Sequence, residues 1–362
     1  MKEERRNFRE QYREVVPAGH LPRSIHLGKN IRFRVDKTPL RYGLSPGDPA
    51  RAYRQDGYSG PSVLGADIIR QGKIRSYSNI EDWDTGLSII SYLNLAFPDE
   101  ECVCVMKHGI PFAVGKASSV EEAYVSAWNR DPIIPFGSVI TLSGVVEKPL
   151  AERIHQVFID GILAKGYTDG AIDVLKKKPD LRIIQLHNLR NPIDDYGYEV
   201  KSVQGGMLLA DRHKLRTLRP EDIGVQSVRQ PDEYILRTAV FQWIVNTHVR
   251  SNAATFGDSN VTYGVGAGQG SRVDALRVAL TISRDRCPYY TKWKKNKDRE
   301  LVLATDGFPP ETDSIEICHE HGIAALMSPK GSLKDQVILD RANELGLLIL
   351  YPKSNERPFT HR

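Results

Sequence analysis

Cysteine is scarce in this chain, with Cys102, Cys104, Cys287 and Cys318 as the four among 362 residues. Their spacing contains no C-x-x-C pair, which argues against a zinc site and a disulfide framework and favours a reducing compartment, the cytoplasm. The chain also lacks any apolar run long enough to span a membrane. Residues 1–16 lack the apolar stretch of a secretion signal, so we interpret them as a short solvated helix or arm.

A strong excess of one charge is missing as well. The formal net charge is +5 over the whole chain, which suits an anionic substrate but falls short of the clustered basic face of a nucleic-acid-binding protein. The densest basic run, residues 292–300, also carries acids, and we interpret it as a solvated loop. We therefore expect neither a nucleic-acid partner nor a membrane partner.

Short apolar runs typical of buried strands alternate with helical patterns along the chain. We expect strands near 102–106, 138–142, 182–186, 253–256, 261–266, 301–305, 324–327 and 347–351. We expect helices near 118–130, 149–164, 232–249, from 271, around 314–322 and around 333–346. This alternation predicts an α/β protein with mostly parallel sheets covered on both faces. Both halves show it, so we expect two similar lobes joined near residues 187–215.

A glycine-rich stretch, TYGVGAGQGSR at 262–272, raises the question of a dinucleotide cofactor. The required third glycine of G-x-G-x-x-G falls on Gln269 or on Ser271 in the two possible frames, so the dinucleotide fingerprint is absent. Ser271 has Asp274 three residues later and can cap a helix. Gln269 and Arg272 can offer donors to a planar polar ligand, although an ordinary strand-to-helix turn with a solvated Arg272 is an equally good interpretation.

Lys107 and His108 follow the expected strand 102–106. Ligands gather outside the carboxyl ends of strands in open α/β sheets, and a histidine beside an ammonium suits proton transfer with charge stabilisation. Both side chains can reach one ligand only if the backbone turns, which Gly109 and Pro111 favour. Taken alone, the pair is more simply a structural histidine beside a surface lysine.

Nine stretches in one order change that balance. They are LRYG, KHGIP, DPIIPFGSVITLSG, DG, RSNA, GVGAGQGSR, ATDGFPP, SPKGS and the terminal ERPFTHR. Together they resemble the 5-aminoimidazole-4-carboxamide ribonucleotide (AICAR) formyltransferase domain of the bifunctional purine biosynthesis family, from about Leu40 to the C-terminus. Too few residues precede Leu40 for the family's IMP cyclohydrolase domain, so we expect a stand-alone transformylase.

The resemblance implies an architecture. The family has two cytidine-deaminase-like, three-layer α/β/α lobes and works as a homodimer with active sites at the subunit interface. We expect an N-terminal arm at 1–39, the first lobe at 40–195 and the second lobe at 196–362. The deaminase zinc signature is absent from this sequence, as it is from the transformylases, so no catalytic metal is expected, while a bound potassium ion is possible in this family.

The resemblance also implies an activity, which is transfer of the formyl group of 10-formyltetrahydrofolate to the 5-amino group of AICAR in purine synthesis. His108 would accept the proton, Lys107 would stabilise the oxyanion or leaving group, and Asn252 would lie beside the amine. The implied nucleotide contacts are Arg41, Tyr42, Gly43, Gln269, Ser271, Arg272, Gly307, Phe308 and Arg357. The implied folate contacts are Phe136, Gly137, Asp160 and Gly161.

Two segments depart from the family pattern. N-P-H-Q after RYG is replaced by residues 45–48, which bring Asp48 near the implied phosphate site, and F-F-P-F-R-D is replaced by residues 308–313. These departures leave open a paralogue that formylates a related amino-heterocycle carboxamide nucleotide in nucleoside natural-product synthesis. A non-catalytic nucleotide-binding protein on the same scaffold is the third hypothesis.

Overall fold

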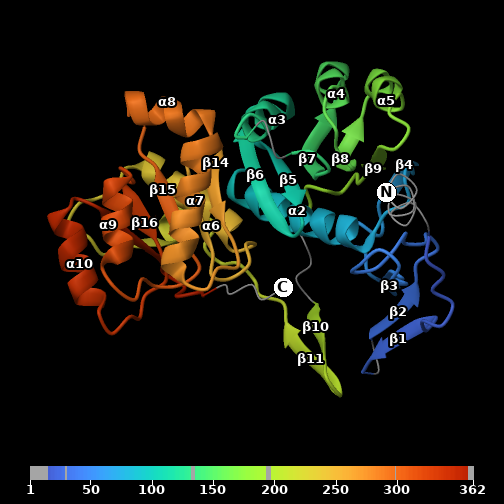
Figure 1. Ribbon diagram of the computed structural model, residues 1–362, viewed down its shortest axis with the longest axis horizontal. Helices are drawn as coiled ribbons and strands as arrows, with labels where there is room; N and C mark the ends of the chain where they lie inside the picture. The colour runs from blue at the N-terminus through green and yellow to red at the C-terminus, as the bar shows by residue number, and fades with distance from the viewer. Residues whose placement is uncertain (1–14, 29–30, 132–134, 193–196, 298, 358–362) are drawn as a thin grey trace, which may run out of the picture.

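Two α/β lobes and two small antiparallel units make up the computed structural model of this chain (Figure 1). The structure describes residues 15–28, 31–131, 135–192, 197–297 and 299–357. Residues 1–14 and 29–30 of the expected N-terminal arm and the end of the terminal motif, residues 358–362, lie outside the described residues.

The first lobe contains a six-stranded sheet with the order β4-β9-β8-β7-β5-β6. Its strands are β4 (Asp67–Arg70), β5 (Glu101–Lys107), β6 (Ile110–Ala117), β7 (Val139–Val146), β8 (Gly161–Tyr167) and β9 (Arg182–Gln185). Its helices are α2 (Tyr77–Ala96), α3 (Val120–Trp128), α4 (Lys148–His155) and α5 (Asp169–Leu175). Ser76 and Ser119 cap α2 and α3, so polar side chains start both helices where backbone N–H groups need partners.

The second lobe repeats this topology with the order β12-β17-β16-β15-β13-β14. Its strands are β12 (Ile223–Val225), β13 (Ala254–Gly257), β14 (Thr262–Gly266), β15 (Val302–Thr305), β16 (Ala325–Met327) and β17 (Leu348–Pro352). Its helices are α6 (Glu233–Asn246), α7 (Arg272–Arg286), α8 (Pro288–Asn296), α9 (Asp313–Glu320) and α10 (Asp335–Glu344), with a short 3-10 turn at Pro220–Asp222. The two similar lobes expected from the alternating patterns are therefore present.

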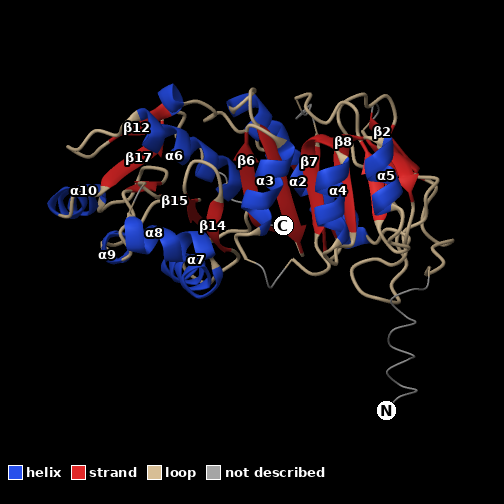
Figure 2. Ribbon diagram, turned by 90° about the horizontal axis from the view of Figure 1, so that it is seen from above, coloured by secondary structure: helices blue, strands red, loops and turns tan. Residues whose placement is uncertain are grey.

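Successive buried side chains along a strand face opposite sides of the sheet, which shows how each lobe is layered. In β5, Val103 and Val105 face the core under α3–α5, whereas Cys104 and Met106 face the core that contains α2. Figure 2 shows α3, α4 and α5 in a row along one face of the first sheet. The helices α2 and α6 share one apolar cluster, so the inner faces of both lobes join in a common core. The predicted three-layer α/β/α lobes are confirmed.

Strand direction in the sheets is mostly, but not wholly, parallel. In the first sheet β6, β7, β8 and β9 run in the same direction, and β4 and β5 run in the opposite direction. In the second sheet β14, β15, β16 and β17 run in the same direction, and β12 and β13 run in the opposite direction. Only two of the five neighbouring pairs in each sheet are therefore parallel. A hairpin, β5–β6 or β13–β14, supplies the reversal at one edge, because antiparallel neighbours need only a tight turn between them.

Two local expectations were wrong. The helix expected at 149–164 ends at His155 as α4, because Ile162 and Leu163 belong to the buried strand β8 and not to a helical stripe. The basic run at 292–300 is not simply a loop. Residues 292–296 belong to α8, where the indole of Trp293 is buried and donates to the Arg299 carbonyl (2.6 Å), so one apolar anchor outweighs the surrounding charges.

The smaller units lie outside the two main sheets. One is the sheet β1-β2-β3, formed by β1 (Ser24–Leu27), β2 (Ile31–Val35) and β3 (Tyr53–Gln55). The other is the hairpin of β10 (Tyr198–Val203) and β11 (Gly206–Asp211), which projects away from both lobes in Figure 1. The structure has no helix, among its described residues, that is long and apolar enough to cross a membrane.

Candidate functional site

Lys107 and His108 lie at a tight turn between β5 and β6. Lys107 ends β5 and Ile110 begins β6, leaving His108 (φ 54°) and Gly109 (φ 75°) as the two turn residues. Two successive positive φ angles are typical of the hairpin turn whose twist matches the strands. A histidine in this left-handed region is uncommon and often marks a functional position. The backbone turn that the Lys-His pair required is therefore present.

Asp82 of α2 fixes the backbone of this turn by hydrogen bonds. Its carboxylate accepts hydrogen bonds from the Gly109 N–H (2.6 Å) and the His108 N–H (3.2 Å). The residue is only 6% exposed, and burial raises the pKa of its carboxyl group while the two N–H donors oppose that rise. Sequence reasoning missed Asp82. The signal was available, since Asn79 and Asp82 are polar residues three apart on the buried face of a helix.

Asp160 and Arg182 form a second polar contact next to the turn. Arg182 begins β9, is 1% exposed, and donates from Nη1 to the Asp160 carbonyl (2.8 Å), with its Nη1 3.7 Å from Asp160 Oδ2. Burial lowers the pKa of Arg182 to about 10, although Asp160 opposes that change. Gly161 has a packing reason to be glycine, because a Cβ there would lie 2.6 Å from the Trp83 ring.

Phe136 joins this group through the Lys107 side chain. Lys107 Nζ donates to the Phe136 carbonyl oxygen at 2.8 Å, and the Phe136 ring is 58% exposed. Gly137 adopts a positive φ of 76°, and its N–H donates to the Phe158 carbonyl (3.1 Å). An exposed ring thus stands beside the lysine and is free to stack on a flat ligand.

Arg41, Tyr42 and Gly43 are distant from α2 in sequence, but backbone hydrogen bonds place Arg41 and Tyr42 beside its N-terminus. The Arg41 N–H donates to the Arg75 carbonyl (2.8 Å), and the Tyr42 carbonyl accepts from the Tyr77 N–H (3.2 Å) at the start of that helix. Arg41 Nη2 donates to the Tyr42 hydroxyl (3.1 Å), whereas Arg41 Nε is buried without a hydrogen-bond partner among the described residues. This leaves a buried guanidinium with unused donor capacity, which suits an anion.

The remaining expected site residues gather in the second lobe. Asn252 Nδ2 donates to the Gln269 carbonyl (3.1 Å), and Arg272 Nη1 donates to the Phe308 carbonyl (3.1 Å). Ser271 caps α7 by accepting from the Asp274 N–H (3.1 Å), as the sequence predicted. The glycine-rich loop is therefore the connection that brings Arg272 to the loop after β15.

Arg272 contacts a buried carboxylate as well as the Phe308 carbonyl. Its Nε lies 3.6 Å from Oδ1 of Asp306, a fully buried carboxylate that sequence reasoning also missed and that accepts from the Ala253 N–H (3.2 Å). A Cβ at position 307 would come within 2.0 Å of the Arg272 guanidinium, so a larger residue there would displace this side chain. The Phe308 ring centroid is 6.0 Å from the Arg272 guanidinium and 5.7 Å from that of Arg357.

The candidate residues form two groups, one around Lys107 in the first lobe and one around Arg272 in the second lobe. The two groups lie at opposite ends of the parallel strands of their own sheets. Arg182 and Asp160 lie at the amino ends of β9 and β8, whereas Phe308 and Arg357 follow the carboxyl ends of β15 and β17. The sequence-based reasoning that Lys107 lies at the carboxyl edge of a parallel sheet was wrong in this respect. β5 runs antiparallel to β7, so its carboxyl end meets the amino ends of β7–β9.

The contact between β6 and β14, where the two lobes meet, nevertheless places both groups at the same end of this contact. Gly115 of β6 forms an antiparallel bridge with Val261, directly before β14, so the parallel strands of the two sheets run in opposite directions. Five residues back along β6 lead to Ile110, and five residues forward along β14 lead to Gly266. The Lys107–Gly109 turn and the 267–272 loop therefore follow the same end of this seam.

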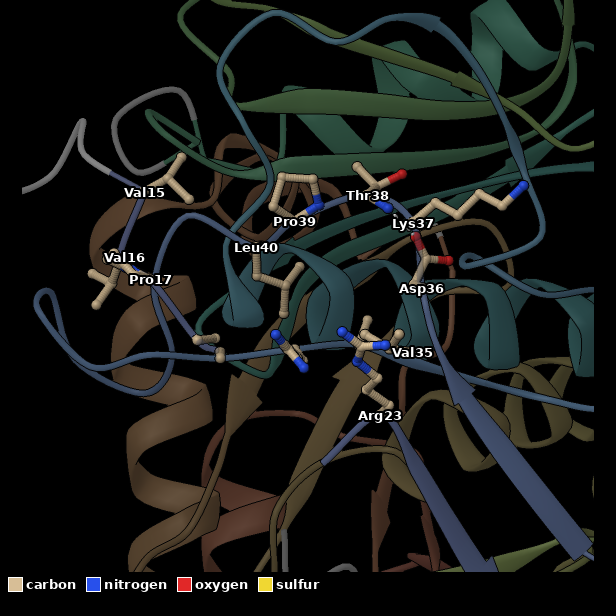
Figure 3. A pocket seen from close by; sticks show the side chains of 14 residues that line it. Val15, Val16, Pro17, Arg23, Val35, Asp36, Lys37, Thr38, Pro39 and Leu40 are labelled. Atoms are coloured by element: carbon tan, nitrogen blue, oxygen red, sulfur yellow. Dashed lines mark hydrogen bonds between the residues drawn. The ribbon is translucent and has the colours of Figure 1, made fainter. Parts of the chain in front are cut away.

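Neither of two prominent cavities contains any of these side chains. A cavity of about 500 Å³ is lined by residues of segments 15–18, 35–40 and 50–52 together with Arg23 (Figure 3). A larger hollow lies among β1–β3, α2 and the β10–β11 hairpin. No group of three or more potential metal ligands occurs in the part of the chain that the structure describes.

Comparison with known proteins identifies relatives. The family model of the AICARFT/IMPCHase bienzyme matches residues 10–282. Three proteins named bifunctional purine biosynthesis protein PurH, from Leuconostoc mesenteroides, Oenococcus oeni and Acetivibrio thermocellus, are 35%, 34% and 30% identical over 92%, 89% and 89% of this chain. A solved structure titled "Structural genomics, protein ybgI, unknown function" aligns over 61% of this chain and 74% of that chain at 12% identity, with a TM-score of 0.13.

The matched regions amount to 62%, 60% and 59% of those three relatives. This chain thus spans about three fifths of the length of the curated relatives it matches. Because the family model covers most of the chain and the identities reach 30% or more, the relationship holds for both lobes together. The chain belongs to the AICARFT/IMPCHase bienzyme family.

Proposed function

We propose that this chain transfers the formyl group of 10-formyltetrahydrofolate to the 5-amino group of AICAR. Membership of the AICARFT/IMPCHase bienzyme family supports the reaction class. The observation that carries the proposal is the placement of the Lys107–His108 turn and the Asn252–Arg272 group at the same end of the seam between the lobes. Such a site can present a base and a set of planar donors to one nucleotide.

The chemistry needs a base and an oxyanion partner. The AICAR amine is a weak nucleophile because its lone pair is delocalised toward the carboxamide, so it must lose a proton as it attacks the formyl carbon. His108 accepts that proton in this proposal, and Lys107 stabilises the negative charge that develops on the formyl oxygen or the leaving nitrogen. The hydrogen bonds from the turn to Asp82 fix the backbone that carries both side chains.

The remaining groups orient the two reactants. Asn252 and Arg272 hold the amine and carboxamide of AICAR in this proposal, and orientation of this kind lowers the barrier by several kcal/mol. The folate would lie against the exposed Phe136 ring near Asp160. The other proposed nucleotide contacts are Arg41, Tyr42, Gly43, Gln269, Ser271, Gly307, Phe308 and Arg357, and the other folate contacts are Gly137 and Gly161.

A homodimer is part of the proposal. The β10–β11 hairpin exposes Tyr198, Val200, Met207 and Leu209 on one face, an apolar surface that a second copy of the chain would cover. Such a partner would also complete the candidate site in this proposal. We further propose a cytoplasmic location, the division into 1–39, 40–195 and 196–362, and no catalytic metal; a potassium site would be an addition to this account.

A related acceptor is the second candidate, and a specific observation favours it. The segments 45–48 and 308–313 depart from the usual family pattern at the implied phosphate and ring contacts. Purified protein should be mixed with 10-formyltetrahydrofolate and AICAR, in parallel with amino-pyrazole carboxamide ribonucleotides, while release of tetrahydrofolate is followed. Turnover with AICAR supports the main proposal. Turnover only with an analogue favours the paralogue, and tight nucleotide binding without any turnover favours a binding protein.

A further inference from the structure

Glu356 is a buried carboxylate in an otherwise exposed segment. It is 7% exposed, whereas Lys353, Ser354 and Asn355 before it and Arg357 after it are exposed. Burial of a carboxylate is costly unless its oxygens accept hydrogen bonds. A buried acid at the end of the last described segment therefore needs a structural reason.

Three neutral donors satisfy this carboxylate. Oε1 accepts from the Trp243 indole N–H (3.0 Å) and from the Thr217 N–H (3.0 Å), and Oε2 accepts from the Arg216 N–H (2.8 Å). Hydrogen bonds from N–H groups to a carboxylate are stronger than bonds between neutral groups. Two oxygens and three fixed donors also define a geometry that an apolar anchor would not define.

The donors lie at the edge of the apolar core that α2 and α6 share. Trp243 lies in α6 and is fully buried in the core that α2 and α6 share. The backbone N–H of Leu215, next to Arg216, donates to the Tyr92 hydroxyl of α2 (3.3 Å). Through Glu356 the C-terminal segment is thus attached to both helices at the centre of the fold.

Arg357 follows immediately and faces the second-lobe group. Its Nη2 donates to the Lys330 carbonyl (2.7 Å), and its guanidinium lies 5.7 Å from the Phe308 ring centroid. A Cβ at Gly331 would come within 2.5 Å of an Arg357 guanidinium nitrogen, so the space around this side chain is tight. A shift of the backbone at position 356 would move Arg357 away from Phe308 and Arg272.

We infer that Glu356 is a positioning residue, which holds Arg357 in place for the phosphate end of the nucleotide. The inference rests on the proposed function, because it assigns Arg357 to nucleotide binding. Glu356 itself is too deeply buried to contact a substrate. Its effect must therefore pass through Arg357, and this requirement distinguishes it from a residue that only stabilises the fold.

The test is steady-state kinetics on Glu356→Gln, Arg357→Ala and the double variant. Gln keeps the side-chain volume but turns an amide NH2 toward one of the three N–H donors. We expect the AICAR KM of Glu356→Gln to rise about tenfold, with kcat and the folate KM within about twofold of wild type. In the Arg357→Ala background the same change should alter the AICAR KM less than about twofold, because residues that act as a unit are not additive.

Two further variants make the test decisive. Trp243→Phe removes one donor without altering the C-terminal segment and should raise the AICAR KM about threefold, which covers the case in which Glu356→Gln fails to fold. Glu344→Gln, an exposed carboxylate paired with Arg341, is the matched control and should leave all constants unchanged.

The inference is overturned if Glu356→Gln lowers only Tm and leaves the AICAR KM unchanged. It is also overturned if the fold-change in AICAR KM of the double variant equals the product of the fold-changes of Glu356→Gln and Arg357→Ala. Absence of both AICAR binding and turnover in the wild-type protein is a different result, which would overturn the proposed function and this inference with it.

Discussion

The carboxylate of Asp82 accepts a hydrogen bond of 2.6 Å from the backbone N–H of Gly109, across the interface between α2 and the β5–β6 turn. The neighbouring His108 N–H donates to the same carboxylate. One buried acid thus holds the backbone of the two residues on which the proposed proton transfer depends. Geometry of this kind matters because small displacements of reacting groups slow an enzyme strongly.

Replacing Asp82 with Ala should therefore impair chemistry more than nucleotide binding. We expect kcat to fall about 100-fold, since the turn loses both of its carboxylate contacts, with a much smaller change in the AICAR KM. Steady-state kinetics and circular dichroism together separate this effect from unfolding. Asp84→Ala, in the same helix but without contact to the turn, is the matched control. A folded Asp82→Ala protein with nearly wild-type kcat would remove Asp82 from the account.

Glu100 should be important for stability because it pairs with two cations. Lys116, which is 2% exposed, and Arg237 of the second lobe both form ion pairs with Glu100, and both lie over the Phe97 ring. Glu100→Ala leaves the buried ammonium without its carboxylate, so we expect the free energy of unfolding to fall by about 3 kcal/mol.

Urea denaturation measures this change. The exposed pair of Glu121 and Arg153 provides the control, and Glu121→Ala should lower the free energy of unfolding by less than about 1 kcal/mol. Equal losses for the two variants would show that Lys116 does not depend on Glu100.

The four cysteine thiols should be unreactive in the folded protein. All are buried, and burial raises the pKa of Cys102 to about 12 from an ordinary value of 9.0. A thiol-specific reagent should label none rapidly in the native state and all four in guanidinium. Rapid native labelling of any thiol would contradict the burial.

The same pKa shift predicts how stability responds to alkaline pH. Between pH 9.0 and about 12 the unfolded Cys102 thiol has lost its proton, whereas the folded thiol retains it. The unfolded state then binds fewer protons, so the free energy of unfolding falls as pH rises through this range. Urea titrations above pH 9 should show that decline, and a rise in stability would contradict it.

Much of the fold follows from local sequence patterns. Buried strands such as β5 and β17 have continuous apolar runs, and helix starts such as Ser271 carry their own capping residues. Strand direction does not follow from such patterns, because a buried strand has the same composition whichever way it runs. The antiparallel placement of β5 was accordingly missed.

The candidate site was predictable only in part. The residues that matched family motifs were found, and the structure brings Lys107 to Phe136, Asn252 to Gln269 and Arg272 to Phe308. The supporting acids Asp82 and Asp306 were missed, because each acts through backbone N–H groups or an arginine distant in sequence. Contacts of this kind depend on the packing of whole elements.

The central claim is that this chain transfers a formyl group to AICAR with His108 as the base. The most direct measurement is the single-turnover rate of AICAR formylation, from bound 10-formyltetrahydrofolate, by wild-type protein and by His108→Ala. The account predicts turnover by the wild type, a rate at least about 100-fold lower for His108→Ala, and nearly equal AICAR affinities. No formylation by the wild-type protein, or an unchanged rate in the variant, would contradict it.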